Sequence, residues 1–174
     1  MIIVPLTALN DRNAFDCGEP SLNQHLQQQA RQSAEKRISS TFVAATPHGS
    51  TAIIGHHTTL VTTLEVTQVP AKVSKARIPA LLLARLAVDR KFQGQGAGEF
   101  LLLDVLRRAD VISGQTGLYA IVLDALTDNA KRFYLRYGFR ELLDNPFIFT
   151  SLSVRSLNSA SRRPEYQAAP LIPR

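Results

Sequence analysis

The sequence predicts a single domain of the α/β or α+β class, in which helices flank one mixed central sheet. β-type segments dominate the first half, whereas the second half alternates strand, glycine-rich loop, helix, strand, helix and strand. The segment Leu81–Val88 is almost wholly apolar and interrupted by Arg85, a pattern typical of a central strand covered on both faces. The length of 174 residues suits one domain of ordinary size.

The first half predicts a short strand, a helix and a hairpin. Ile2–Leu6 is expected to be the short strand. A helix is expected from Ser21, as its N-cap, to about Arg37, because apolar residues recur at every fourth position. Two β-type segments on either side of the turn Pro47-His48-Gly49 predict the hairpin: Thr41–Thr46 and Thr51–Val66.

The second half predicts the remaining elements. In order they are an irregular loop or short helix at Val69–Pro79, a strand at Leu81–Val88, a helix at Glu99–Ile112, a strand at Leu118–Ala125, a helix at Thr127–Tyr137 and apolar segments ending near Val154. Residues 1–154 are therefore expected to form the domain. Residues 155–174, rich in Ser, Arg, Pro and Ala, are expected to be a tail that is mobile or bound to a partner.

Composition excludes several classes of protein. The hydrophobic fraction of 45% and the charged fraction of 20% are ordinary for a soluble protein. No segment approaches the roughly 18 uncharged apolar residues of a membrane span, and the N-terminus lacks signal-peptide features, so the cytoplasm is the expected location. The single cysteine, Cys17, cannot form an intramolecular disulfide and is expected to pack as a small hydrophobe.

The net charge of +6 is concentrated in one stretch. Between Thr67 and Lys91 there are six basic residues and one acidic residue, Asp89. The basic residues are Lys72, Lys75, Arg77, Arg85, Arg90 and Lys91. This surplus fits a polyanionic partner such as a nucleotide, RNA or an acidic peptide, and it fits a solvated basic loop equally well.

A glycine-rich loop, Gln93-Gly94-Gln95-Gly96-Ala97-Gly98, lies between the apolar strand and an expected helix. Glycines let the backbone approach a ligand, and the free amides at a helix N-terminus favour an anion such as a diphosphate. The glycine spacing differs from the dinucleotide-binding pattern, and no Lys follows Gly98 as a Walker loop requires. A tight turn without a ligand is the alternative. The loop resembles the acyl-CoA loop of the GNAT acetyltransferase superfamily, Q/R-x-x-G-x-G/A.

A second motif, within Asn129–Phe139, resembles the GNAT pattern A-x-x-F-Y-x-x-x-G-F at every fixed position. The resemblance implies that Tyr134 is the acid that protonates the departing thiolate of CoA, for which a positioned phenol is chemically suited. It also implies acetyl-CoA as cosubstrate, with no metal. The implied CoA contacts are the backbone of Leu86, Ala87 and Val88, the loop residues Gln93, Gly94, Gln95, Gly96, Ala97 and Gly98, and Asn129 and Phe133.

No residue stands out as a general base. Asp89 ends the apolar strand, and His56 and His57 are expected to face opposite sides of their strand because neighbours alternate. A base is not required for an α-amino group, whose pKa of about 7.7–8.0 leaves a useful fraction neutral.

Three further segments resemble the GNAT toxins of type II toxin–antitoxin modules. They are Phe15–Leu26, matching F-x-C-G-x-x-x-L-N-x-x-L; Ile54–Leu60, beside I-x-G-Y-Y-x-L; and Ile78–Asp89, beside I-P…L-x-R-L-A-V-D. His56 and His57 replace the usual aromatic pair, and the tail after Arg155 matches no family pattern.

The toxin resemblance implies acetylation of the α-amino group of aminoacyl-tRNA, a ribbon-helix-helix antitoxin as partner, and a homodimer. The basic strip Lys72–Lys91 suits tRNA, and Arg85 is expected either to hold the acceptor end or to form an ion pair with Asp124. Two alternatives are a GNAT enzyme acting on a small amine or a protein N-terminus, and a non-catalytic module that binds CoA or antitoxin.

Overall fold

The computed structural model describes residues 1–46, 51–64, 77–142 and 145–151, with side chains as far as residue 141. Several predictions therefore fall outside the described residues: the turn Pro47-His48-Gly49, most of the loop Val69–Pro79, Lys72, Lys75 and the tail 155–174. No helix within the described ranges is both long and apolar enough to cross a membrane.

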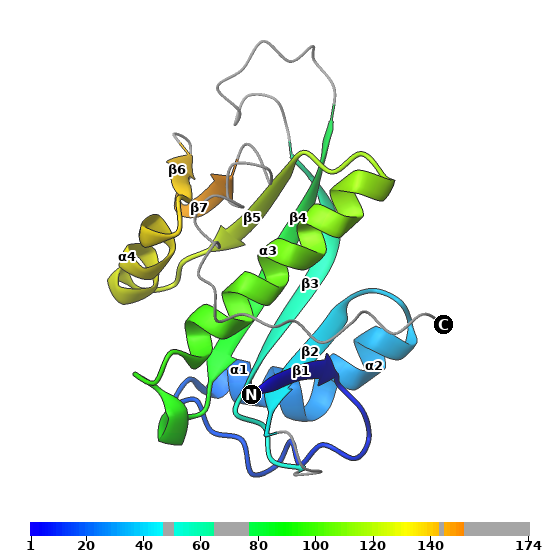
Figure 1. Ribbon diagram of the computed structural model, residues 1–174, viewed down its shortest axis with the longest axis vertical. Helices are drawn as coiled ribbons and strands as arrows, with labels where there is room; N and C mark the ends of the chain where they lie inside the picture. The colour runs from blue at the N-terminus through cyan, green and yellow to red at the C-terminus, as the bar shows by residue number, and fades with distance from the viewer. Residues whose placement is uncertain (47–50, 65–76, 143–144, 152–174) are drawn as a thin grey trace.

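The centre of the fold is a seven-stranded mixed sheet with the strand order β1-β2-β3-β4-β5-β7-β6 (Figure 1). Neighbouring strands are antiparallel except β4 and β5, which are parallel. The strands are β1 (Ile2–Pro5), β2 (Ser40–Ala45), β3 (Gly55–Leu64), β4 (Ile78–Val88), β5 (Ala120–Asp124), β6 (Arg140–Leu142) and β7 (Asn145–Ser151). The predicted mixed sheet with flanking helices is confirmed.

Helix α3 (Ala97–Gln115) runs across one face of the sheet, and α4 (Asp128–Arg136) lies beside it on the same face (Figure 1). Leu102 and Val105 of α3 are fully buried and belong to one core cluster with Leu83 of β4 and Leu123 of β5. Tyr134 of α4 belongs to the same cluster. The apolar stripe of α3 therefore fixes this helix, and with it the end of the glycine loop, relative to the central strands.

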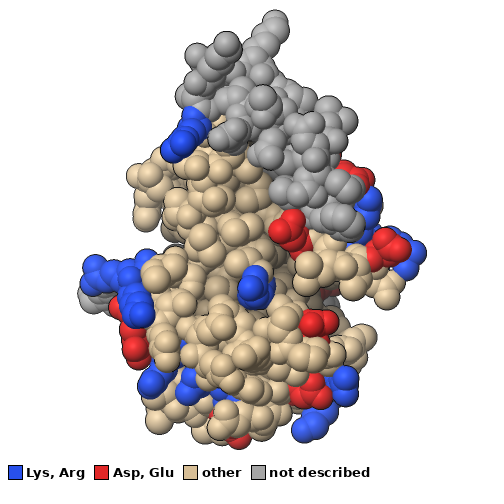
Figure 2. All heavy atoms as spheres, turned by 180° about the vertical axis from the view of Figure 1, so that it is seen from behind, with Lys and Arg blue, Asp and Glu red and all other residues tan. Residues whose placement is uncertain are grey.

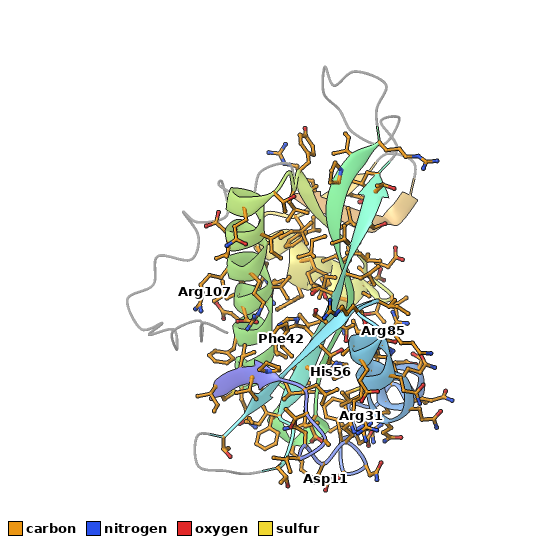
Figure 3. All side chains as sticks on the ribbon, turned by 90° about the vertical axis from the view of Figure 1, so that its right-hand side faces the viewer. Asp11, Arg31, Phe42, His56, Arg85 and Arg107 are labelled. Atoms are coloured by element: carbon orange, nitrogen blue, oxygen red, sulfur yellow. The ribbon has the colours of Figure 1, made fainter. Side chains whose placement is uncertain are left out.

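The opposite face is covered by a helical segment made of α1 (Pro20–Gln24), the π-helical turn η1 (His25–Gln29) and α2 (Ala30–Glu35). Its buried residues, Leu26 and Ala30, pack against Phe15 and Val43. Figure 2 shows this side of the molecule, on which charged side chains lie interspersed with large uncharged areas. Figure 3 shows the two helical layers on either side of the sheet.

The predicted N-cap of the first helix is wrong. Glu19, not Ser21, is the N-cap, and its carboxylate accepts hydrogen bonds from the backbone N–H and the hydroxyl of Ser21. Pro20 explains the difference, because proline suits the first helical position, where its missing N–H would have no partner. The π-helical turn was also not predicted; it closes with a bond from the Ala30 N–H to the His25 carbonyl.

Two strand boundaries also differ from the prediction. In the described part of the segment predicted as Thr51–Val66, the strand begins only at Gly55, because the Thr51 carbonyl and Ala52 pair with Asp11 instead. The central strand begins at Ile78, three residues before the predicted Leu81, since Ile78–Ala80 continue the pairing with β3.

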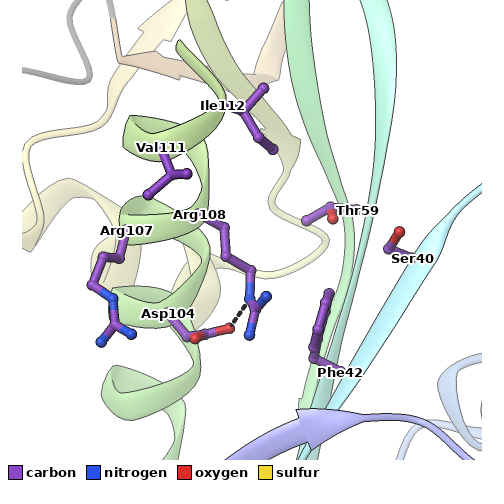
Figure 4. A pocket seen from close by; sticks show the side chains of 8 residues that line it. All are labelled: Ser40, Phe42, Thr59, Asp104, Arg107, Arg108, Val111 and Ile112. Atoms are coloured by element: carbon purple, nitrogen blue, oxygen red, sulfur yellow. Dashed lines mark hydrogen bonds and ion pairs between the residues drawn. The ribbon is translucent and has the colours of Figure 1, made fainter. Parts of the chain in front are cut away.

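His56 and His57 face opposite sides of β3, as predicted. On the α3 side, the Nε2 of His57 lies 2.8 Å from the Oδ2 of Asp104, which also accepts a 2.6 Å bond from the Nε of Arg108. The Arg108 guanidinium lies 3.5 Å above the ring of Phe42, in a cavity of about 210 Å³ (Figure 4). This buried polar group links α3 to β3.

On the other side of β3, His56 is fully buried and packs edge-on against the Phe15 ring, with centroids 5.2 Å apart. Neither ring nitrogen of His56 has a hydrogen-bond partner among the described residues. Burial lowers the pKa of His56 to about 3, so the imidazole is neutral in the folded protein at physiological pH.

The buried His56 makes stability depend on pH. Its folded pKa of about 3 lies below the unfolded value of about 6.5, so the unfolded chain binds one more proton between these values. Stability should therefore fall by about 1.4 kcal/mol per pH unit from this residue as pH drops below about 6. His56→Leu should flatten the pH dependence measured by urea denaturation at pH 7.5, 6 and 5. The half-buried His25, changed to Gln, is the control and should leave most of the slope; an unchanged slope in His56→Leu would contradict the assignment.

Candidate active site

The central sheet splits between β4 and β5. Their parallel pairing runs from Ala80 and Ala120 to Leu83 and Leu123 and stops there, while β4 continues to Val88. A β-bulge accompanies the split: Thr58 of β3 pairs with Arg85, and Thr59 pairs with Leu83, so Ala84 has no cross-strand partner. The backbone of residues 84–88 therefore has no β5 partner on one side. Leu86, Ala87 and Val88, predicted to pair with pantetheine, all belong to this edge.

The glycine loop follows directly and leads into α3. Gly94 and Gly96 have φ values of 75° and 83°, a conformation that favours glycine, and space beside both α-carbons is open. Gly96 is the N-cap of α3 and offers no side-chain cap, so the amides of Ala97 and Gly98 are free to bind an anion. This geometry suits a pyrophosphate.

Two glutamines brace the loop. The Gln93 Nε2 donates 2.9 Å bonds to the carbonyls of Cys17 and Val88, and the Gln95 Nε2 donates to the Lys91 carbonyl. Their side chains hold the loop against β4 and the N-terminal segment, while the backbone amides of Ala97 and Gly98 remain free for the ligand.

Asp89 is a structural residue, because its buried carboxylate already accepts two backbone bonds. The N–H of Asp16 donates to its Oδ2 at 3.1 Å, and the N–H of Lys91 donates to its Oδ1 at 3.0 Å. The second bond caps the short 3-10 helix η3 (Arg90–Phe92). Both oxygens of the carboxylate are therefore engaged by backbone donors of the protein itself.

Tyr134 is buried beneath the split, on α4. Thr127 caps this helix by accepting a bond from the Ala130 N–H, and aromatic contacts fix the phenol ring between Phe133 and Phe139, at centroid distances of 5.1 and 5.7 Å. Burial raises the pKa of Tyr134, so the phenol is protonated. The group is therefore suited to donate a proton and unsuited to act as a phenolate base.

Phe133 connects α4 to the glycine loop. A Cβ built on Gly98 would lie 3.8 Å from the Val88 side chain and 3.9 Å from the tip of the Phe133 ring. These three residues thus meet where the unpaired edge of β4 approaches α3 and α4. Asn129, by contrast, is exposed on the first turn of α4, where its side-chain oxygen accepts a bond from Arg132.

A cavity of about 400 Å³ opens at the split and reaches the face that carries α1. Tyr134 lines it together with Ser21 and Leu22 of α1, and residues Leu82–Leu86 of β4 form another wall. Three charged side chains line it as well: Glu19, Arg85 and Asp124. The cavity therefore extends from the phenol on one face of the sheet to charged side chains on the other face.

Arg85 donates a 2.7 Å bond from its Nη1 to the Ala84 carbonyl and lies on the side of the sheet opposite α3 (Figure 3). Of the two roles expected for Arg85, the ion pair with Asp124 is wrong: within the described part of the chain no ion pair joins them, although both line the cavity. The remaining donors of the Arg85 guanidinium are free for another ligand.

The other basic candidates are more dispersed. Arg77 and Lys91 are exposed, whereas Arg90 pairs with Asp16 at 3.3 Å and covers Gly18. Cys17 packs against the core cluster of Phe15 and Leu26, and burial raises the pKa of its thiol, so its predicted packing role is confirmed. No group of His, Cys, Asp and Glu side chains in the described ranges is arranged to hold a metal.

Sequence reasoning missed the exposed Asp124 as a residue that lines the cavity, since it considered only an ion pair for it. Its place at the C-terminal end of the strand preceding the Tyr134 helix was the available signal. It also missed the His57–Asp104–Arg108 group, which no local pattern reveals because Asp104 follows His57 by 47 positions.

Known proteins resemble this chain over most of its length. The family model of the acetyltransferase (GNAT) domain matches residues 38–141. A tRNA-acetylating toxin of Mycobacterium tuberculosis (strain ATCC 25618 / H37Rv) is 33% identical over 133 residues, which cover 75% of this chain and 78% of that protein.

Solved structures of the toxin AtaT have the same fold. AtaT complexed with acetyl-methionyl-tRNAfMet aligns with a TM-score of 0.84 and 26% identity, covering 91% of this chain and 97% of AtaT. A mutant of AtaT bound to the C-terminus of the antitoxin AtaR and to acetyl-CoA aligns with a TM-score of 0.78 and 27% identity, covering 92% and 97%. The predicted family resemblance is confirmed, and this chain belongs to the GNAT acetyltransferase family.

Proposed function

We propose that this protein is the toxin of a type II toxin–antitoxin module and transfers the acetyl group of acetyl-CoA to the α-amino group of aminoacyl-tRNA, thereby inhibiting translation. The observation that carries the proposal is the cavity at the split, where Tyr134 and the free edge of β4 meet the unpaired Arg85. Similarity to a tRNA-acetylating toxin and to AtaT supports the same substrate.

Acetyl-CoA is assigned to the side of the sheet that carries α3 and α4. The amides of Ala97 and Gly98 would bind its pyrophosphate, and the free backbone edge at Leu86–Val88 would pair with the amides of its pantetheine arm. Phe133, next to Gly98, would pack against that arm, and Asn129 would contact it from the first turn of α4. These contacts bring the thioester to the split beside Tyr134.

With the thioester in place, the reaction needs a neutral amine as nucleophile and a proton donor for the departing sulfur. The neutral amine attacks the thioester carbonyl, a C–N bond forms, and the C–S bond breaks. Tyr134 gives its proton to the departing sulfur, and the proton released from the new amide nitrogen restores the phenol through water. An α-amino group supplies enough neutral amine near pH 7.5 without a side-chain base.

Alternative acceptors fit the cavity less well. A polyamine or a lysine side chain carries positive charge only, so it would leave Arg85 without an anion to bind. A non-catalytic module would have no use for a buried, protonated phenol that lines a cavity beside a free strand edge. A protein N-terminus stays the nearest competitor, because it is also an α-amino group.

The assembly implied by this function is part of the proposal. We expect a homodimer in the cytoplasm and neutralisation by a ribbon-helix-helix antitoxin, in line with the complex of AtaT and the antitoxin AtaR. Residues 1–154 are the proposed catalytic domain, with residues 155–174 as a tail.

With labelled acetyl-CoA, the protein should transfer label to a pool of charged tRNA, but not to uncharged tRNA or polyamines. Tyr134→Phe should lower this rate by about 10²- to 10⁴-fold, because it removes the acid while keeping the ring packing. Binding of acetyl-CoA by calorimetry should not change. Label on small amines alone would reject tRNA as substrate, and a fully active Tyr134→Phe variant would reject the acid assignment.

Gly98→Ala should weaken binding of acetyl-CoA at least tenfold while leaving the melting temperature equal or higher. The added Cβ fits at ordinary contact distance from Val88 and Phe133, but it stands where the ligand must approach. Gly114→Ala is the matched control, since it makes the same change in the same helix with open space around it. Equal affinities in both variants would show that CoA does not pass Gly98.

The basic strip is assigned to tRNA: Lys72, Lys75, Arg77, Arg85, Arg90 and Lys91. Changing Lys72, Lys75 and Arg77 to Gln together should lower the slope of log binding constant against log salt by about 2 to 3. The same charge change at Arg31, Lys36 and Arg37, which lie in and just after α2, is the control. An unchanged slope in the first variant would mean that the strip serves another partner.

A further inference from the structure

We propose that Asp124 forms a subsite for the ammonium group of the acceptor, facing an anion subsite at Arg85, so that the cavity recognises a ligand carrying both charges. This inference rests on the proposed function and names the part of the substrate that each charge binds. Asp124 would be a positioning residue: it holds the α-ammonium group beside the thioester before the group loses its proton to water.

Both charges project from the same face of the sheet. Alternation along β5 places Asp124 with Ala120 and Val122, whose core cluster lies on the face opposite α3. The bulge at Ala84 places Arg85 on that face too, with Ala87, which packs in the cluster beneath the α1–α2 segment. Adjacent strands thus present a cation and an anion at the point where they diverge.

The two charges do not neutralise each other. No ion pair within 4 Å joins Arg85 to Asp124, and the hydrogen bond of Arg85 goes to its neighbouring carbonyl. The Asp124 carboxylate has no hydrogen bond or ion pair with any described residue. The third charged residue of the cavity, Glu19, is already engaged by the backbone N–H and hydroxyl of Ser21.

Because the two opposite charges share a cavity without pairing, the carboxylate and the guanidinium are both available to bind a ligand. A free carboxylate favours a cationic donor, and a guanidinium favours a phosphate through charge-assisted hydrogen bonds. The aminoacyl end of tRNA carries an α-ammonium group close to a phosphodiester, so it matches both. A polyamine lacks the anion, and a protein N-terminus has no fixed anion near its ammonium group.

The residues that line the cavity bring the ammonium subsite, the phosphate subsite and the acid together. Asp124 and Thr127 precede α4, the helix that carries Tyr134, and all three residues line the cavity. Arg85 lies on β4 and lines the same cavity, as do Ser21 and Leu22 of α1. An ammonium group on Asp124 would therefore share one cavity with the acid Tyr134 and with a phosphate on Arg85.

The test compares two stable analogues of a charged 3′ end. Each is an acceptor-stem RNA whose terminal amino acid, glycine or methionine, is joined by an amide; in the second analogue a hydroxyl replaces the α-amino group. The dissociation constants are measured at pH 6.5 with CoA bound. The wild-type protein should prefer the ammonium analogue by about tenfold, as a charge-assisted bond predicts.

Asp124→Asn should reduce this preference to below about twofold without changing affinity for the hydroxyl analogue or for CoA. Arg85→Gln should weaken binding of both analogues by the same factor. Asp128→Asn, the same change on an exposed residue that does not line the cavity, is the matched control and should keep the preference.

Each other outcome overturns a defined statement. A preference retained in Asp124→Asn, or lost only in Glu19→Gln, overturns the ammonium subsite and leaves tRNA as the substrate. If the wild-type protein binds neither analogue but acetylates the pool of charged tRNA, only the subsite is overturned; if it also fails to acetylate that pool, the proposed function fails with it.

Discussion

The active site depends on the point at which β4 and β5 stop pairing. Up to Leu83 and Leu123 the two strands share a parallel ladder, and beyond it β4 keeps a partner only in β3. Backbone N–H and C=O groups that have no partner are costly unless water or a ligand binds them. An extended ligand with its own amides can supply those partners, so the split in the sheet is suited to bind such a ligand through the backbone alone. The same divergence opens the cavity that connects the two faces of the sheet.

The bulge at Ala84 decides which chemistry reaches that cavity. Strict alternation would put Arg85 on the face of Leu81 and Leu83, inside the apolar cluster under α3. The extra residue reverses the pattern, so that Arg85 emerges on the α1 side and Leu86 takes the place against α3. A β-bulge commonly redirects a side chain next to an active site. Here it converts what would be a buried, unpaired cation into a charge that lines the cavity.

Local motifs predicted the parts of the site that depend on neighbouring residues. The glycines at 94 and 96 take positive φ and Gly96 starts α3, because a strand-to-helix turn of this kind requires that geometry. Tyr134 lies on its short helix because Thr127 caps it and aromatic side chains hold the ring. Both results follow from interactions within about ten residues.

Long-range geometry explains what the sequence did not predict. The roles of Arg85 and Asp124 depend on the bulge and on which strands are adjacent, and neither is encoded in a short window. The buried contact of His57 with Asp104 joins residues 47 positions apart. The π-helical turn at His25–Gln29 shows the same limit on a smaller scale, since periodicity alone predicts an uninterrupted helix.

In the proposed reaction, burial of Tyr134 constrains the order of events. Because burial raises the pKa of this phenol, the proton leaves only when a strong base, the developing thiolate, is next to it. The resulting phenolate in an apolar pocket is unfavourable, so it must recover a proton as the new amide nitrogen loses one. Proton transfer is then efficient only if the amine and the thioester occupy the split together. A substrate bound on the α1 face and a cofactor bound on the α3 face satisfy this condition, because the gap between β4 and β5 is the place where the two faces meet.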